Sequence, residues 1–268
     1  MKKFLKGMKG LYSTIIFLFL YAPIVVMITF SFNGAKSRGT WGGFSLRWYE
    51  ELFADSRIIQ ALGNTLFVAI VAALVATFIG TIAAIGINAM HRVPQGIVMN
   101  VSYLPVLNAD IVTGVSLLIL FISLGIPLGR VSLLLAHITF NIPYVILSVM
   151  PKLKQMNKHS YEAALDLGCT PISALVKVVL PEILPGVVTG AILAFTLSID
   201  DFVISFFTSG AGVGTLSTEI YSQVRRGVKP SMNALSTIMF VAVLLLLIIV
   251  NIRSSREAGG GQKNKERH

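Results

Sequence analysis

Charged side chains are scarce in this sequence. Asp, Glu, Lys and Arg make up 13% of its 268 residues, whereas apolar side chains make up 54% and the mean hydropathy is +0.79. Soluble globular proteins carry charge on about a quarter of their residues, so this composition excludes a soluble domain. It also excludes a disordered chain, because such chains contain few apolar residues.

Cysteines and enzyme motifs are nearly absent as well. Cys169 is the single cysteine, which excludes an intrachain disulfide and a cysteine-based metal site. The sequence lacks the phosphate loop Gly-x-x-x-x-Gly-Lys-Ser/Thr and the patterns His-Glu-x-x-His and Gly-x-Ser-x-Gly, and its four histidines are scattered. We therefore expect no catalytic residue, no metal and no cofactor in this chain.

Long apolar runs are the dominant feature of the sequence. A helix needs about 20 apolar residues to cross a hydrocarbon core of about 30 Å. The runs predict an all-α integral membrane protein with six transmembrane helices, forming one domain over residues 1–252. The predicted spans are 11–32, 63–89, 97–123, 131–150, 187–207 and 234–252.

The basic residues predict how these spans are oriented. If the amino terminus lies inside, the inner segments hold 14 of the 22 Lys and Arg residues and the outer segments hold eight. This bias places both termini in the cytoplasm, so topology explains the net charge of +10 and no nucleic-acid partner is expected. Residues 253–268 are expected to be a disordered cytoplasmic tail. Trp41, Trp48 and Tyr49 fit an aromatic belt at the outer membrane surface, with a short helix over 48–57.

Three carboxylates fall within the apolar spans: Asp110, Asp200 and Asp201. Each costs about 2.5–3.5 kcal/mol at the centre of a membrane helix, so such residues usually face a water path or a partner. No Lys or Arg within the spans is available to pair with them, which favours a cation with several ammonium groups as cargo. Protonated aspartates, or aspartates paired with another subunit, are the alternatives. Adjacent helix positions differ by about 100°, so Asp200 and Asp201 cannot both face the path.

The inner segment over 151–186 is unusually long and patterned. One short helix is predicted from Ser160, a good N-cap, to Gly168. A second is predicted from Pro171 to Leu180, ending at the two prolines that follow.

Within this segment, Glu162-Ala-Ala-x-x-x-Gly168, nine residues, and then Val178-x-Leu-Pro181 resemble the EAA loop of the membrane subunits of bacterial ABC importers. The resemblance implies a type I ABC importer permease fold, in which this loop forms coupling helices that sit in a groove of a separate ATP-binding subunit. The alternative is a helix-turn-helix that lies on the bilayer or under its own helix bundle. The residues implied in coupling are Glu162, Ala163, Ala164, Gly168, Leu180 and Pro181.

Three further segments are similar to the permease subunits of spermidine/putrescine importers: 21–33, 197–207 and 224–237. This resemblance implies a multi-pass protein of the bacterial cytoplasmic (inner) membrane, surrounded by lipid. It also implies a heterodimer with a paralogous permease, an ATPase dimer that binds ATP and Mg, and an extracytoplasmic polyamine-binding protein. Asp110, Asp200 and Asp201 would line the substrate path.

Other functions remain open at this stage. An ABC importer permease could carry another cation, an amino acid derivative or a metal chelate. A self-contained secondary transporter or channel is disfavoured because the sequence shows neither an inverted repeat nor broken helices. A membrane enzyme is disfavoured because no nucleophile or metal cluster is evident.

Overall fold

The computed structural model describes residues 2–35, 40–227, 229–245 and 248. Helices are the main regular elements of these residues, with one isolated β-bridge between Asn33 and Phe44, and the all-α prediction is confirmed. The chain divides into two compact units. The central unit is Gln60–Glu219, and the terminal unit combines Met1–Ile59 with Ile220–His268.

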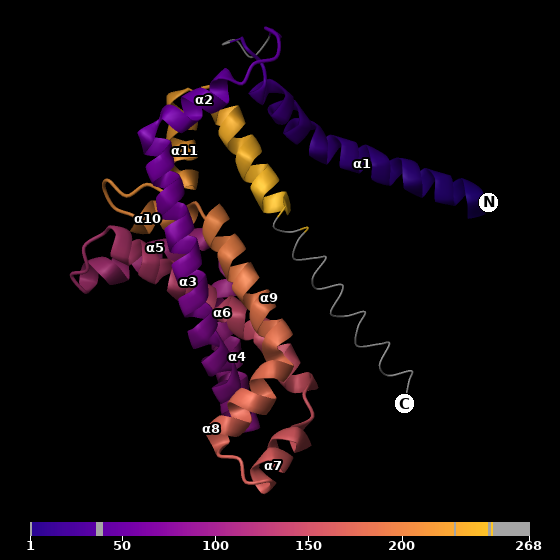
Figure 1. The fold of residues 1–268 in the computed structure, drawn as a ribbon, viewed down its shortest axis with the longest axis vertical. Helices are drawn as coiled ribbons and strands as arrows, with labels where there is room; N and C mark the ends of the chain where they lie inside the picture. The colour runs from indigo at the N-terminus through magenta and orange to yellow at the C-terminus, as the bar shows by residue number, and fades with distance from the viewer. Residues whose placement is uncertain (1, 36–39, 228, 246–247, 249–268) are drawn as a thin grey trace. The chain divides into compact units, whose positions relative to one another are not determined.

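The helices follow one another with short connections (Figure 1). In chain order they are α1 (Lys2–Ser31), α2 (Arg47–Ala54), α3 (Ser56–Ala89), α4 (Arg92–Leu107), α5 (Asp110–Ser123), α6 (Arg130–Gln155), α7 (Lys158–Asp166), α8 (Pro171–Ala174), the π-helical turn η1 (Leu175–Val179), α9 (Leu180–Asp200), α10 (Val203–Thr208) and α11 (Leu216–Arg226). A further apolar helix, Ser231–Leu245, follows α11.

Most predicted spans have counterparts among these helices. Four described segments are long and apolar enough to cross a membrane, or five if α4 and α5 form one span. The four are Gly10–Ser31, Ser56–Ala89, Arg130–Gln155 and Pro171–Asp200. The sixth predicted span begins within Ser231–Leu245, and its remainder lies largely outside the described residues, as does the predicted tail over 253–268.

The predicted third span, 97–123, is wrong as a single helix. The chain forms α4 and α5, whose axes are bent by 104° at the break between them. The two residues at the break, Asn108 and Ala109, have extended backbones with ψ of 152° and 137°. Hydropathy could not reveal this bend. A run of apolar residues indicates that a segment lies in an apolar environment, but it does not indicate whether the helix is continuous.

The predicted fifth span, 187–207, is also interrupted. Helix α9 ends at Asp200, Asp201 is extended with ψ of 124°, and α10 begins at Val203. The expectation that broken helices are missing from this protein is therefore wrong. At a broken helix, some backbone N–H and C=O groups lose their helical partners. Polar side chains near the break can form hydrogen bonds with these groups.

The prolines that were predicted to end the second loop helix do not end it. Helical structure continues from Pro171 to Asp200 through both prolines. In the π-helical turn before Pro181, the Leu180 N–H donates to the Leu175 carbonyl oxygen, five residues back. This wider turn shifts the bonding register just before Pro181, whose missing N–H would interrupt a regular ladder.

Close packing of α6 on α9 forms the core of the central unit. Gly186 and Gly190 of α9 lie one turn apart and face Val145 and Ser148 of α6. Small residues at this spacing let two membrane helices approach closely. The buried residues of the cluster around this contact are Ala73, Ala84, Ile87, Val145, Ile146, Val149, Met150, Leu153, Val179, Ile183 and Ala194.

Gly186→Ala should destabilise this packing. An added Cβ would lie 2.8 Å from Lys152 Cγ and 3.0 Å from the Ser148 carbonyl oxygen, and the backbone atom cannot move without separating α6 from α9. We expect a loss of about 1–3 kcal/mol, seen as a lower unfolding temperature in detergent. Gly86→Ala is the matched control, because nothing lies within 4 Å of its added Cβ. Equal unfolding temperatures for the two variants would contradict the prediction.

In the terminal unit, the short helix predicted over 48–57 is present as α2 (Arg47–Ala54), but Trp48 is buried and does not fit the predicted aromatic belt. Trp48 is 3% exposed and donates its Nε1–H to the Asn33 carbonyl oxygen. The Tyr49 hydroxyl lies 2.8 Å from Ser31 Oγ. These polar tips satisfy the chain where it turns after α1, so Trp48 is part of the internal packing, whereas Trp41 is exposed.

Candidate translocation and coupling sites

The three aspartates of the predicted spans lie at the two helix breaks. Asp110 is the first residue of α5 and is exposed. Asp200 is the last residue of α9 and is also exposed, whereas the next residue, Asp201, is largely buried with a side chain 7% exposed. The sequence predicted only that Asp200 and Asp201 face different directions. The structure shows that Asp200 is exposed and Asp201 is largely buried.

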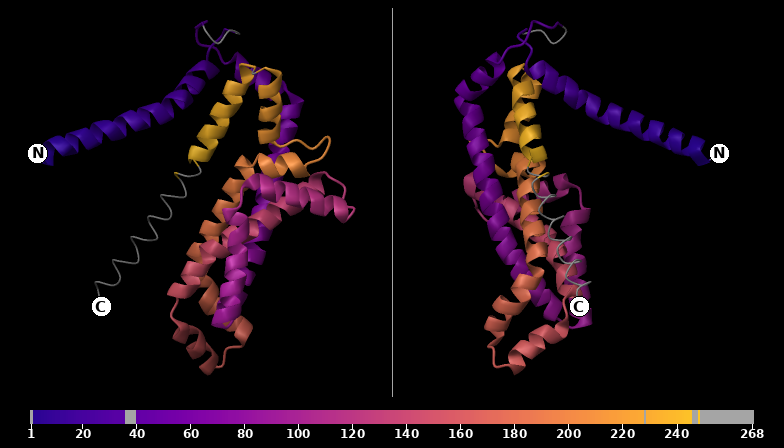
Figure 2. Two further views of the ribbon diagram at one scale, coloured as in Figure 1. Left: turned by 180° about the vertical axis from the view of Figure 1, so that it is seen from behind. Right: turned by 45° about the vertical axis from the view of Figure 1, so that its right-hand side comes forward.

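The short helices that begin at these breaks pack against each other. Figures 1 and 2 show α5 and α10 side by side, both crossing the direction of the longer helices. Gly114 of α5 permits the contact, since a Cβ there would lie 3.0 Å from Phe207 Cδ2. Buried apolar residues seal the junction with α6: Leu117, Phe121, Ala136, Phe140 and Ile204. The two breaks therefore belong to one packed structure.

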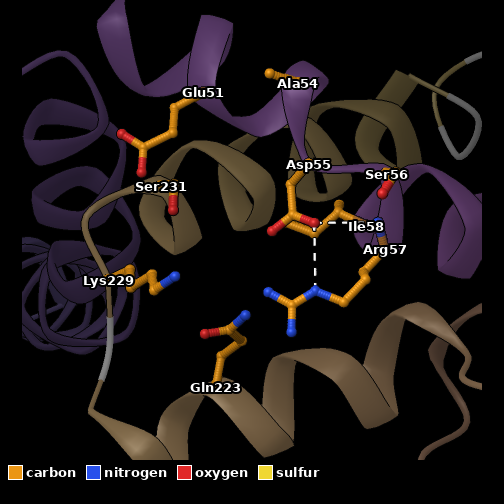
Figure 3. Close-up of a pocket in the computed structure, with 9 residues that line it drawn as sticks. All are labelled: Glu51, Ala54, Asp55, Ser56, Arg57, Ile58, Gln223, Lys229 and Ser231. Carbon is orange, nitrogen blue, oxygen red and sulfur yellow. Dashed lines mark hydrogen bonds and ion pairs between the residues drawn. The ribbon is translucent and has the colours of Figure 1, made fainter.

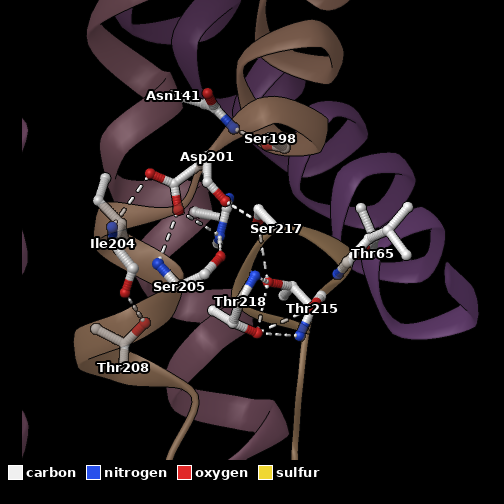
Figure 4. A network of polar contacts seen from close by, with 12 residues as sticks. Thr65, Asn141, Ser198, Asp201, Ile204, Ser205, Thr208, Thr215, Ser217 and Thr218 are labelled. Carbon is white, nitrogen blue, oxygen red and sulfur yellow. Dashed lines mark hydrogen bonds and ion pairs between the residues drawn. The ribbon is translucent and has the colours of Figure 1, made fainter. Parts of the chain in front are cut away.

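The Asp201 carboxylate caps α10 (Figure 4). Its Oδ1 accepts the Ile204 N–H at 3.1 Å, and its Oδ2 accepts the Ser205 N–H at 2.7 Å. The Asp201 carbonyl oxygen accepts the Ser217 hydroxyl at 2.6 Å. These groups would otherwise be unsatisfied at the broken helix, so this carboxylate performs the work of an N-cap.

One face of α6 carries polar side chains toward these breaks. The His137 Nε2 lies 3.1 Å from Ser205 Oγ and 3.6 Å from Asp201 Oδ2. Asn141, one turn later, donates from Nδ2 to Ser198 Oγ at 2.7 Å.

Tyr144 continues the same face of α6, where its ring packs against that of Phe140 with centroids 5.1 Å apart. Sequence reasoning missed this polar face because it treated the histidines as scattered. The signal was available as His137, Asn141 and Tyr144, spaced by four and three residues within an apolar helix.

The loop that resembles the EAA motif lies away from α5 and α10, at the end of the central unit where Figure 1 labels α7 and α8. Its helix α7 begins one turn earlier than predicted, because the Asn157 side chain accepts the His159 N–H at 3.1 Å and Ser160 does not cap. Glu162 is exposed, with Oε2 lying 3.2 Å from His159 Nδ1. Ala163 is exposed beside it.

This loop has both buried and exposed apolar residues. Ala164 is 8% exposed and turned inward. Gly168 has a φ of +87° and ends α7, allowing the Cys169 N–H to reach the Ala164 carbonyl oxygen at 3.0 Å. Leu167 and Ile172 are then left 86% and 76% exposed. An apolar surface of this kind beside an exposed carboxylate suits a protein partner.

Leu180 and Pro181 have a different position from the other motif residues. They begin α9, where Leu180 packs against the buried cluster between α6 and α9. Pro181 is exposed. These two residues therefore connect the loop to the core rather than extend its exposed surface.

A polar cavity of about 390 Å³ lies within the terminal unit (Figure 3). Its charged lining is balanced: Glu51 and Asp55 are acidic, and Arg57 and Lys229 are basic. Arg57 Nε lies 3.5 Å from Asp55 Oδ1. Among the described residues, no group of three or more His, Cys, Asp or Glu side chains could hold a metal ion.

Comparisons with known proteins agree with this architecture. Residues 76–254 match the family described as binding-protein-dependent transport system inner membrane component. The spermidine/putrescine transport system permease protein PotC of Haemophilus influenzae is 40% identical over 90% of this chain and 94% of that protein. The putrescine transport system permease protein PotI of Escherichia coli is 40% identical over 85% of this chain and 83% of that protein.

Solved structures show the same fold at low sequence identity. A bacterial ABC transporter that imports the acidic polysaccharide alginate has a chain with a TM-score of 0.72 and 18% identity, covering 95% of this chain and 96% of that chain. An amino acid ABC transporter has a chain with a TM-score of 0.57 and 18% identity, covering 78% of this chain and 98% of that chain. The family match and the two permease relatives together show that this chain belongs to the binding-protein-dependent transport system inner membrane components.

Proposed function

We propose that this ABC importer permease subunit carries polyamines, with spermidine and putrescine as its substrates. The relatives that are 40% identical over most of the chain are named for these cargoes. The structural observation that supports the cargo is the pair of exposed carboxylates, Asp110 and Asp200, at two helix breaks whose short helices pack together. Separated carboxylates suit a flexible chain that bears separated ammonium groups.

The path is expected to lie along the breaks because backbone at a broken membrane helix must be buried in protein or line a cavity. Asp110 and Asp200 provide negative charge there, and Asp201 supports the second break from within. A paralogous permease would supply the other half of the path. An extracytoplasmic binding protein would deliver the polyamine to it.

Energy is proposed to enter through the loop between α6 and α9. Glu162, Ala163, Leu167 and Ile172 form an exposed surface on which an ATPase subunit can dock. ATP and Mg would be bound by that subunit. Its closure would move α7, and Leu180 would transmit the motion to the α6–α9 core. This arrangement requires the loop and both termini to be cytoplasmic, as the distribution of basic residues predicts.

Uptake of labelled polyamine tests the proposed cargo. Cells that lack their own polyamine importers would receive the neighbouring transport subunits with or without this chain. We expect uptake of spermidine or putrescine only when the chain is present, with competition by the other polyamine. Absence of uptake of both, in cells where this chain co-purifies with an ATPase, would refute a polyamine cargo and point to a different cation.

A further inference from the structure

The side chain of His137 is fully buried, and its Nε2 atom faces the break between α9 and α10. Its side chain is 0% exposed, and Nε2 faces both Ser205 Oγ and Asp201 Oδ2 at 3.1 and 3.6 Å. Its other nitrogen, Nδ1, has no hydrogen-bond partner in the part of the chain that the structure describes. A hydrogen on Nδ1 would thus be buried and unsatisfied, while a lone pair on Nε2 would face a carboxylate. We therefore assign the hydrogen to Nε2, which lies within hydrogen-bond distance of Ser205 Oγ and close to the Asp201 carboxylate.

Helix α10 is attached to α6 at both of its ends. At its start, His137 meets the carboxylate of Asp201 and the hydroxyl of Ser205. At its end, the Ser132 hydroxyl donates to the Thr208 carbonyl oxygen at 2.8 Å. A helix of six residues has little stability of its own, so these side-chain contacts determine its direction.

We propose that His137 is a positioning residue that holds the Asp201 carboxylate in its cap on α10 and thereby fixes the direction of the Asp200 side chain. Asp200 and Asp201 are adjacent across the break, and the Asp201 N–H completes the last turn of α9 by donating to Leu197 at 3.1 Å. If the carboxylate leaves the cap, both the end of α9 and the start of α10 are released. His137 itself does not contact cargo in this scheme, and its effect on transport rests on the proposed function of Asp200.

Substitution of His137 in the full importer complex tests this role. We expect His137→Leu to raise the polyamine concentration for half-maximal uptake by about tenfold, with the yield of assembled complex retained. His137→Gln keeps an N–H near the position of Nε2 and should stay within about threefold of the wild type. His91→Leu is the matched control, since His91 is exposed and makes no side-chain cap, and it should transport normally.

A double variant distinguishes positioning from a general loss of stability. If His137 acts through Asp201, then His137→Leu combined with Asp201→Asn should transport no worse than the poorer single variant. Losses that multiply would overturn the proposal, as would unchanged uptake in His137→Leu. If His137→Leu does not assemble, His137→Gln is compared with His137→Asn, whose shorter amide cannot reach Asp201. Equal uptake by these two would also overturn it.

A readout without cargo keeps the two hypotheses separate. Amide hydrogen exchange at Ile204 and Ser205, whose N–H groups bond to Asp201, should accelerate by about tenfold in His137→Leu and not in His91→Leu. Unchanged exchange would overturn the positioning role. The wild-type complex could transport no polyamine while exchange still accelerates in the His137→Leu variant. That result would refute the proposed cargo and support the role of His137.

Discussion

We expect polyamine uptake to fall by about tenfold to a hundredfold when Asp200 is replaced by Asn, because in the proposed function the substitution removes a charge that would face an ammonium group while preserving side-chain shape. Asp200 is exposed at the end of α9 and has no capping role, so the loss should come from cargo binding. The measurement is initial uptake of labelled spermidine and putrescine as a function of concentration. We expect the concentration for half-maximal uptake to rise and the amount of assembled complex to stay the same.

One control variant and one comparison variant show whether the loss of uptake is specific to Asp200. Glu50→Gln removes an exposed carboxylate from α2, and uptake should be unchanged. Asp201→Asn should lower both uptake and thermal stability, since that carboxylate accepts two backbone N–H groups. Normal uptake in Asp110→Asn, Asp200→Asn and Asp201→Asn alike would refute the proposal that carboxylates line the path.

Association with the ATPase subunit is expected to be lost when Glu162 is changed to Lys. The Glu162 side chain is 68% exposed and belongs to the same loop as the exposed apolar side chains of Leu167 and Ile172. Reversal of its charge would place like charges together against a basic partner groove, which costs several kcal/mol. We expect at least about a tenfold drop in the ATPase that co-purifies with the permease, and loss of ATP-driven uptake.

The same charge change at an exposed site outside this loop separates docking from folding. Glu50→Lys on α2 should leave the ATPase association intact. Membrane insertion of the Glu162→Lys protein should match that of the wild type, because the Glu162 side chain is 68% exposed and its ion-pair partner, His159, is exposed as well. Full ATPase association in Glu162→Lys would contradict the assignment of this loop to coupling.

Hydropathy predicted the helices well where a span is straight and poorly where it is broken. The run over 131–150 became α6 with only modest extension, because its apolar residues lie in one continuous helix. The run over 97–123 became α4 and α5, and the run over 187–207 ended in α9 with α10 beyond it. Both breaks have extended residues whose backbone geometry no apolar count records.

The sequence predicted local motifs more completely than it predicted which residues form hydrogen bonds with each other in the folded protein. Gly168 was expected to end a helix, and its φ of +87° explains why a glycine is there. The cap was assigned to Ser160 although Asn157 provides it, because several nearby residues can accept an N–H and only the fold selects one. Trp48 was assigned to the membrane surface for a similar reason, since its bond to Asn33 joins residues 15 positions apart.

By itself, the sequence determined that this protein is helical, lies in a membrane, has aspartates within apolar runs and carries a motif that resembles the EAA loop, since composition, run length and short-range spacing are local properties. Only the tertiary structure decided which aspartate is exposed and which is used internally. That distinction depends on His137, 64 residues before Asp201 in the chain yet 3.6 Å from its carboxylate. Long-range packing of α6 against α9 and α10 creates this contact, and local sequence patterns do not record it.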